Sequence, residues 1–272
     1  SLLIAADTSG IPAWTLADLS LDAIGRSDSL DWGIGTTVGT SSRFDGTGWW
    51  TRSDALSRIG VDTLAANLGT GLWRLLEPTV LALPDSGAPL LAPTAIVAAD
   101  RSGELRIGGR LPLNAPGELT ASAFGLDLRD LYDLVGRDTT GVRGNIAVEL
   151  EGSGTAESPA FRGTASLADA QFGDAQMPYV EGVLNYGDRR LDANLLLWRT
   201  GTPVLRVEAQ LPYDLALRGA TRRRVDGPLN VRARGDSVEL AILEAFIPTI
   251  ERVRGFLTAD GTMTLAFGRA YG

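Results

Sequence analysis

The chain contains one ordered series of segments twice, and this repeat constrains the fold more than any single residue does. Leu105-Arg106-Ile107 continues to Leu111-Pro112-Leu113, and one hundred residues later Leu205-Arg206-Val207 continues to Leu211-Pro212-Tyr213. A supersecondary unit that recurs in this way is typical of an elongated, stacked architecture in which neighbouring units bury a continuous apolar surface. It argues against a compact enzyme built around one asymmetric site.

Each copy continues with a second strand-like segment, a short amphipathic turn and a third strand-like segment. In the first copy these are Gly117-Glu118-Leu119, the turn with Leu128 and Leu131, and Val142-Arg143-Gly144. In the second copy they are Gly227-Pro228-Leu229, the turn with Leu240 and Leu243, and Val253-Arg254-Gly255. We therefore predict one elongated domain, residues 1–272, with a less regular part at 1–100 and two repeat-related units at 101–200 and 201–272. The second unit is incomplete.

Apolar and polar residues alternate along most segments, which is typical of strands with one dry face and one wet face. Between Leu205 and Leu211, for example, the odd-numbered residues are apolar and the even-numbered ones are polar. Turn signals such as Pro84-Asp85-Ser86-Gly87 and Asp100-Arg101-Ser102-Gly103 separate the segments. Turns that recur every ~10–15 residues favour an antiparallel meander.

Helical spacing is rare in this chain. One short amphipathic stretch contains Leu128, Leu131, Leu134 and Val135. Another contains Leu240, Leu243, Phe246 and Ile247 and is stopped by Pro248. Residues 54–68 fit neither the helical nor the strand period cleanly. We therefore expect two or three short amphipathic helices in a mainly β chain.

The dry face of a long meander must be hidden from water. Two sheets can pack as a sandwich, the sheet can close as a barrel, or it can curl into a trough with an apolar lining. An outer-membrane barrel is disfavoured because the six tryptophans do not form the two aromatic girdles of such barrels. The repeat favours the open form, because stacked units extend a surface without closing it. We predict a long antiparallel meander curled into an elongated, β-taco-like groove.

Composition excludes several classes of function. The net charge of −8 disfavours nucleic-acid binding, which needs a basic surface. The chain has no histidine, no cysteine and no lysine, so the common nucleophile–base pairs, thiolate zinc sites and the Walker phosphate loop are excluded. Glu149 and Glu151, two apart, are interpreted as an exposed strand face. We predict no enzyme activity, no cofactor and no metal.

Two further segments bear on membranes. The run Ala88–Ala99 is interrupted by Pro89 and Pro93 and is far short of the ~20 residues that a spanning helix needs. The chain begins at Ser1 without a signal peptide, so we interpret it as an interior piece of a longer protein whose anchor lies elsewhere. Arg222-Arg223-Arg224 is interpreted as a solvated loop, with contact to anionic lipid headgroups as the alternative.

An ordered series of short motifs resembles a known family. The series is Gly48-Trp49-Trp50, Trp73-Arg74-Leu75 with Pro78, Gly103-Glu104-Leu105, the Leu-x-x-Leu turns followed by Val-Arg-Gly, Ser158-Pro159-Ala160-Phe161-Arg162-Gly163, and Tyr179-Val180-Glu181-Gly182. In this order they resemble the family of the translocation and assembly module subunit TamB and the AsmA-like proteins of bacteria with two membranes. Each motif is weakly specific by itself, and the likeness covers most of the chain.

The resemblance implies a protein anchored in the inner membrane, with a long β-sheet curled into a hydrophobic groove that crosses the periplasm. It implies transport of phospholipid towards the outer membrane, and outer-membrane biogenesis together with an Omp85-type partner. The chain lacks the N-terminal anchor and the C-terminal region that would meet that partner, so docking is not expected of these residues.

Our first hypothesis is a segment of a periplasmic lipid conduit whose partners are phospholipid acyl chains. The candidate lining residues share the apolar phase of the alternation: Leu105, Ile107, Leu111, Leu113, Ile146, Val148, Leu150, Leu195, Leu197, Val207 and Leu211. The alternative is a structural or adhesive β-repeat protein with a closed core and no cargo. The two differ in whether the apolar side chains contact a ligand or one another.

Overall fold

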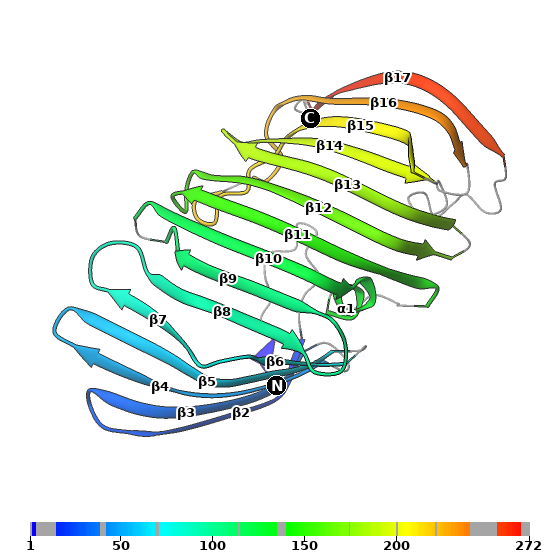
Figure 1. Ribbon diagram of the computed structural model, residues 1–272. Helices are drawn as coiled ribbons and strands as arrows, with labels where there is room; N and C mark the ends of the chain where they lie inside the picture. Colours follow the sequence, from blue (N-terminus) through cyan, green and yellow to red (C-terminus); the bar gives the residue numbers. More distant parts are fainter. Residues whose placement is uncertain are drawn as a thin grey trace.

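The computed structural model describes residues 2–3, 15–38, 42–68, 71–113, 115–134, 140–173, 175–199, 201–220, 222–239 and 255–267. These residues are mainly β, and their 17 strands belong to one antiparallel sheet accompanied by a single short helix (Figure 1).

The first eight strands cover roughly the first hundred residues. Their bounds are β1 Leu2–Leu3, β2 Thr15–Gly25, β3 Ser29–Val38, β4 Ser42–Ser53, β5 Leu56–Leu68, β6 Gly71–Leu75, β7 Thr79–Pro84 and β8 Leu90–Ala98. Residues 54–68, which fit neither period in the sequence, are mostly strand, because β5 pairs with β4 on one side and with β6 and β7 on the other.

The remaining elements include the helix. They are β9 Glu104–Arg110, β10 Gly117–Asp127, α1 Leu128–Leu134, β11 Val142–Gly154, β12 Pro159–Phe172, β13 Ala175–Gly187, β14 Arg190–Arg199, β15 Thr202–Pro212, β16 Gly227–Glu239 and β17 Phe256–Phe267. Of the expected helices, α1 is the one found in the described part of the chain, and the stretch from Leu240 to Ile247 lies outside it.

The strands pair in chain order, each antiparallel to the next, from β2 to β5 and from β8 to β17. Figure 1 shows this meander, with β2 near one margin of the sheet and β17 at the other. One position departs from the pattern: β6 and β7 both lie between β5 and β8 and are separated by Leu76-Glu77-Pro78. Pro78 cannot donate a ladder hydrogen bond, so an interruption at this point is favoured.

The two repeat copies occupy equivalent places in the meander. The first copy supplies β9, β10, α1 and β11, and the second supplies β15, β16 and β17. Both carry a β-bulge of one residue at the same point, between Ala123 and Leu126 in β10 and between Gly235 and Val238 in β16. In the first copy the bulge contains Gly125, whose φ is 62° and whose added Cβ would lie 2.4 Å from the Ser102 carbonyl oxygen. A glycine is therefore required there.

The strand prediction is wrong at Leu111 and Leu113. We expected both to continue the apolar phase of Leu105 and Ile107, but β9 ends at Arg110. The paired part of β8 begins at Leu90, which lies opposite Arg110, and the Leu111 backbone N–H donates instead to the Pro89 carbonyl, 2.8 Å away. In the second copy β14 offers a longer partner, so Leu211 stays in β15 opposite Leu191.

The fully buried apolar side chains lie mostly near the ends of the strands. At one end, Ala170, Met177 and Leu197 form a cluster against which Leu167, Phe172, Val180, Val204 and Leu205 pack. At the opposite end, Ala156, Tyr186 and Ala216 are buried. Along the middle of the sheet most apolar side chains are only half-buried, with Ala193 an exception. The core of the described residues is therefore divided between the two strand ends.

Candidate functional site: the apolar face of the sheet

Cross-strand pairing places apolar residues in continuous rows across β9 to β17, because paired residues point to the same side of a sheet. One row is Ile107, Ala121, Leu150, Gly163, Leu184, Ala193, Ala209, Val231 and Met263. The next is Leu105, Ala123, Val148, Ala165, Gly182, Leu195, Val207, Ala233 and Gly261. We call this side of the sheet the apolar face.

Nine of the eleven candidate lining residues lie on the apolar face. Eight belong to the two rows or to the neighbouring row that joins Ile146, Leu167, Val180 and Leu197, and the register also places Leu211 beside Leu191 on this side. In full they are Leu105, Ile107, Ile146, Val148, Leu150, Leu195, Leu197, Val207 and Leu211. Leu111 and Leu113 lie in the turn after β9 and are not part of the rows.

The middle of the apolar face is accessible to solvent. Ile107 and Leu195 each expose 37% of their surface, whereas Leu197, nearer the strand end, exposes 8%. Within the described residues the extensive contacts of each strand are with its neighbours in the sheet, and α1 contacts β5, β10 and β11. No second sheet covers this face in the described part of the chain, so its apolar rows are in reach of a ligand.

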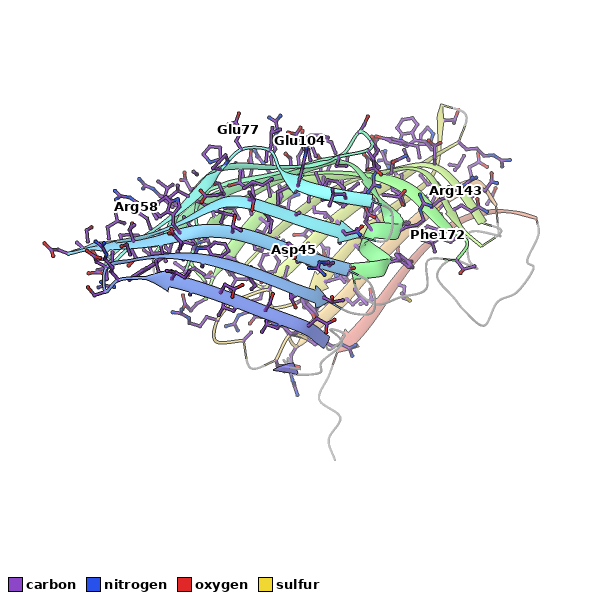
Figure 2. The ribbon with its side chains drawn as sticks, turned by 90° about the horizontal axis from the view of Figure 1, so that it is seen from below. Asp45, Arg58, Glu77, Glu104, Arg143 and Phe172 are labelled. Atoms are coloured by element: carbon purple, nitrogen blue, oxygen red, sulfur yellow. The ribbon has the colours of Figure 1, made fainter. Side chains whose placement is uncertain are left out.

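The opposite side of the sheet, the polar face, has a matching row of mostly hydrophilic residues. It runs through Arg106, Ser122, Glu149, Thr164, Val183, Asn194, Glu208, Arg232 and Thr262. Ion pairs join strands or neighbouring residues on this face, among them Arg162–Glu151 at 3.0 Å and Arg106–Glu104 at 2.8 Å. Figure 2 shows Glu104 projecting away from the ribbon at the upper margin of the view. Glu149 and Glu151 accordingly lie on a solvated strand face.

Three acid–base pairs shift the pKa values of their members on this solvated side or near it. The hydrogen bond from Arg43 lowers the pKa of Asp45, and the hydrogen bond to Glu104 raises the pKa of Arg106. Burial pushes the pKa of Asp127 upward, but its hydrogen bonds from the Arg129 side chain and backbone outweigh this, and the net shift is downward. These pairs stabilise charged forms, so they offer no proton donor or acceptor poised near neutral pH.

A broad depression of about 1610 Å³ spans β8 to β13. Its walls include polar-face side chains such as Glu149 and Arg162 as well as Ile107 and Leu150. This mixed lining does not by itself define an apolar groove. The site is therefore described by the rows of residues and their exposure.

A buried polar node fixes α1 at one end of the strands. Asp130 in α1 is buried and accepts a hydrogen bond from Trp73 Nε1 at 3.2 Å and another from the Arg101 guanidinium. The Arg101 guanidinium also lies over the Trp73 ring, 5.5 Å from its centroid. Tyr132 of α1 approaches Phe172 of β12, with ring centroids 6.5 Å apart. The helix is thereby tied to β6, to the β8–β9 turn and to β12.

At the opposite strand end, the connection between β15 and β16 folds back along the sheet. We call its described residues, 213–220 and 222–226, the arginine loop. Leu215 N–H donates to the Tyr186 hydroxyl at 2.7 Å, and Leu217 N–H donates to the Ala156 carbonyl at 2.7 Å. Figure 1 shows this loop running from β15 past the ends of β14 and β13 towards the β11–β12 turn. It contacts the end of the sheet opposite to α1.

Sequence reasoning missed both of these end structures. The signal for the first was an aspartate, Asp130, inside an apolar helical stretch between Leu128 and Leu131. A charge at such a position is compatible with burial only if it has a partner. Nothing in the sequence indicated that Trp73 and Arg101, far away along the chain, would be that partner.

The chemistry offered by the described residues is that of an apolar surface. The described residues contain no group of three or more His, Cys, Asp or Glu side chains that could hold a metal ion, and no described helix has the length and hydrophobicity to cross a bilayer. Exposed leucine, isoleucine and valine side chains bind apolar matter through the hydrophobic effect, which is nondirectional and proportional to area.

Comparison with protein-family models, with curated proteins and with solved structures found no match for the chain.

Proposed function

We propose that this chain is a lipid-binding segment of a conduit between the inner and outer membranes, and that acyl chains lie on its apolar face. The observation that carries the proposal is the accessible middle of that face, where Ile107 and Leu195 stay 37% exposed in the described residues. Covering rows of this kind stabilises both partners, because each methylene group removed from water contributes about 0.8 kcal/mol.

The rows also orient the proposed path relative to the strands. They run across the strands, so a ligand that follows them lies between β9 and β17 and contacts a new strand about every 4.8 Å. A groove curled around this path, with headgroups in solvent at its edge, is part of the proposal. So are the periplasmic location, the anchor outside this segment, the role in outer-membrane biogenesis and the Omp85-type partner, which rest on the family resemblance.

Site-specific photo-crosslinking tests the proposal with controls built into the same strands. A photoreactive residue at Ile107 or Val207 faces the apolar rows, whereas one at Arg106 or Glu208 faces the polar face. We expect phospholipid adducts in cells from the first pair and none from the second. Protein adducts alone at Ile107 and Val207 would contradict the proposal.

A charge on the apolar face should block the path without unfolding the sheet. We expect Val148→Asp to weaken binding of a fluorescent fatty acid at least about tenfold, because the carboxylate would lose its hydration under an acyl chain. Thr164→Asp, on the exposed polar face, is the matched control and should bind as the unmodified chain does. If Val148→Asp instead loses its cooperative unfolding transition, Val148 is ordinary core.

The second candidate function is a structural scaffold. It is favoured by the packed cluster of Ala170, Met177 and Leu197, where apolar side chains already contact one another. Native mass spectrometry of the purified chain separates the two candidates. Lipid that co-purifies supports the conduit, and its repeated absence supports the scaffold.

A further inference from the structure

The arginine loop presents an apolar side chain at its tip although its backbone is held firmly. Leu215, Leu217 and Arg218 each donate a backbone hydrogen bond, to the Tyr186 hydroxyl in the first case and to the Ala156 carbonyl in the other two. Leu217 nevertheless exposes 60% of its surface. A leucine that is free to move can fold inward. One carried by an anchored loop remains in solvent.

A second set of bonds holds the loop from within. The Arg223 guanidinium donates to the carbonyls of Asp214, at 3.2 Å, and Ala216, at 2.5 Å. The carboxylate of Asp214 is buried and accepts from the Ala216 N–H at 2.9 Å. Arg223 is thus a structural residue, and the conformation that exposes Leu217 is maintained by several polar contacts.

Exposed guanidinium groups lie on the arginine loop and on the neighbouring β13–β14 turn. Arg189, Arg218 and Arg222 keep 65%, 61% and 67% of their side chains exposed. Between Tyr213 and Asp226 the chain has four arginines and two aspartates, whereas the whole chain carries a net charge of −8. This end of the sheet is a locally basic patch on an acidic protein.

The acidic partners of Arg218 and Arg222 are held loosely, whereas Arg189 pairs with the buried Asp214 carboxylate at 3.5 Å. The Arg218–Glu157 nitrogen–oxygen distance is 4.0 Å and the Arg222–Asp226 distance is 3.7 Å, and both acids are exposed. Ion pairs of this kind contribute little to stability. The guanidinium groups can therefore exchange them for phosphate oxygens, which they bind well through paired N–H donors.

From these observations we propose that the arginine loop is a contact site for the surface of an anionic phospholipid bilayer. Leu217 enters the headgroup region, and Arg218 and Arg222 bind lipid phosphates beside it. An apolar residue flanked by arginines matches the interface of a bilayer, which is apolar below and anionic above. The contact does not require acyl chains on the apolar face. If both occur, the loop brings one end of that face beside a membrane.

Vesicle flotation of the full chain tests this contact. We expect the chain to float with vesicles that contain phosphatidylglycerol, to remain unbound with phosphatidylcholine alone, and to be released by salt. The double variant Arg218→Glu with Arg222→Glu should bind at least about tenfold more weakly, since each basic residue near an anionic surface contributes about fivefold to affinity. Leu217→Ser should weaken binding by several fold.

Matched controls carry the same changes elsewhere. Arg58→Glu with Arg74→Glu alters two exposed arginines of β5 and β6, and Leu76→Ser alters an exposed leucine between β6 and β7. Both should bind vesicles as the unmodified chain does. Equal binding to the two vesicle types, or equal losses in the loop variants and the controls, would overturn the contact. Release by millimolar glycerol phosphate at constant ionic strength would assign the arginines to a soluble phosphate and would also overturn it.

The same variants separate this inference from the proposed function. The loop variants should bind a fluorescent fatty acid normally, and Val148→Asp should float with anionic vesicles normally. Loss of vesicle binding in the Val148→Asp variant would mean that the apolar face makes the contact, which would contradict the role of the loop.

Discussion

The two repeat copies form similar strand pairs in the same sheet, but they differ in the structures that lie at the ends of those strands. In both, a strand pair presents the same apolar rows and carries a bulge at the same place, between Ala123 and Leu126 or between Gly235 and Val238. In the first copy, however, the turn between β9 and β10 is short. Helix α1 packs at the opposite strand end of this copy. The second copy carries the arginine loop between β15 and β16. The sheet thus tolerates different connections, because register depends on the pleat and the bulge.

The largest expected effect is a loss of stability in the first copy alone. Asp130→Ala removes the carboxylate that accepts hydrogen bonds from the Trp73 indole N–H and the partly buried Arg101, and removing one member of a buried pair costs about 3–5 kcal/mol. Denaturant unfolding measures the loss, and hydrogen exchange should localise it to β9–β11, with β15–β17 less affected. Asp226→Ala, which removes an exposed acid of the second copy, is the control and should change stability by less than about 1 kcal/mol. Equal effects of the two variants would show that α1 is not anchored by this node.

A smaller effect should follow from loosening the second copy. Arg223→Ala removes the hydrogen bonds to the carbonyls of Asp214 and Ala216, and we expect a loss of roughly 2 kcal/mol. Limited proteolysis should then cut within the arginine loop much faster, while amide exchange in β9 and β10 stays the same. Arg222→Ala, one residue away, should leave the proteolysis rate unchanged. Protection of the loop in the Arg223→Ala variant would place its anchor in other contacts.

The smallest effect concerns pH and tests an ion pair of the first copy. The pKa of Asp127 in the first copy is lowered by Arg129, so its contribution is present above the unfolded-state value near 4 and is lost as pH falls through the lower folded-state pKa. Asp127→Asn should remove this acid-dependent part of stability, worth less than about 1 kcal/mol because the pair is partly exposed. Unfolding curves of the variant and the unmodified chain between pH 2 and 6 check it. A steeper acid loss in the variant would contradict the sign of the shift.

Much of the fold follows from local sequence patterns. Period-two alternation correctly assigned nine of the eleven candidate residues to one side of the sheet, since every side chain of a strand alternates between two faces. The spacing of Leu128 and Leu131 matched the position of α1. The prediction failed at Leu111 and Leu113, because the length of β9 depends on the partner that β8 provides.

The candidate site was only partly predictable. The sequence identifies which residues are apolar and share one strand face. The accessibility of Ile107 and Leu195, however, depends on what else covers the sheet. Likewise, Arg223 and its neighbours Arg222 and Arg224 are the same residue type in one run. Only Arg223 turns inward to the Asp214 and Ala216 carbonyls.

The sequence by itself determined that this chain is a meander with one apolar and one polar face, because hydrophobic periodicity acts locally and every strand carries its own copy of the signal. The tertiary structure alone decided how the two strand ends are closed. The Trp73–Asp130–Arg101 node joins residues up to 57 positions apart, and the arginine loop reaches back to Ala156 and Tyr186. Such contacts require the folded sheet to bring distant residues together, so no local sequence pattern predicts them.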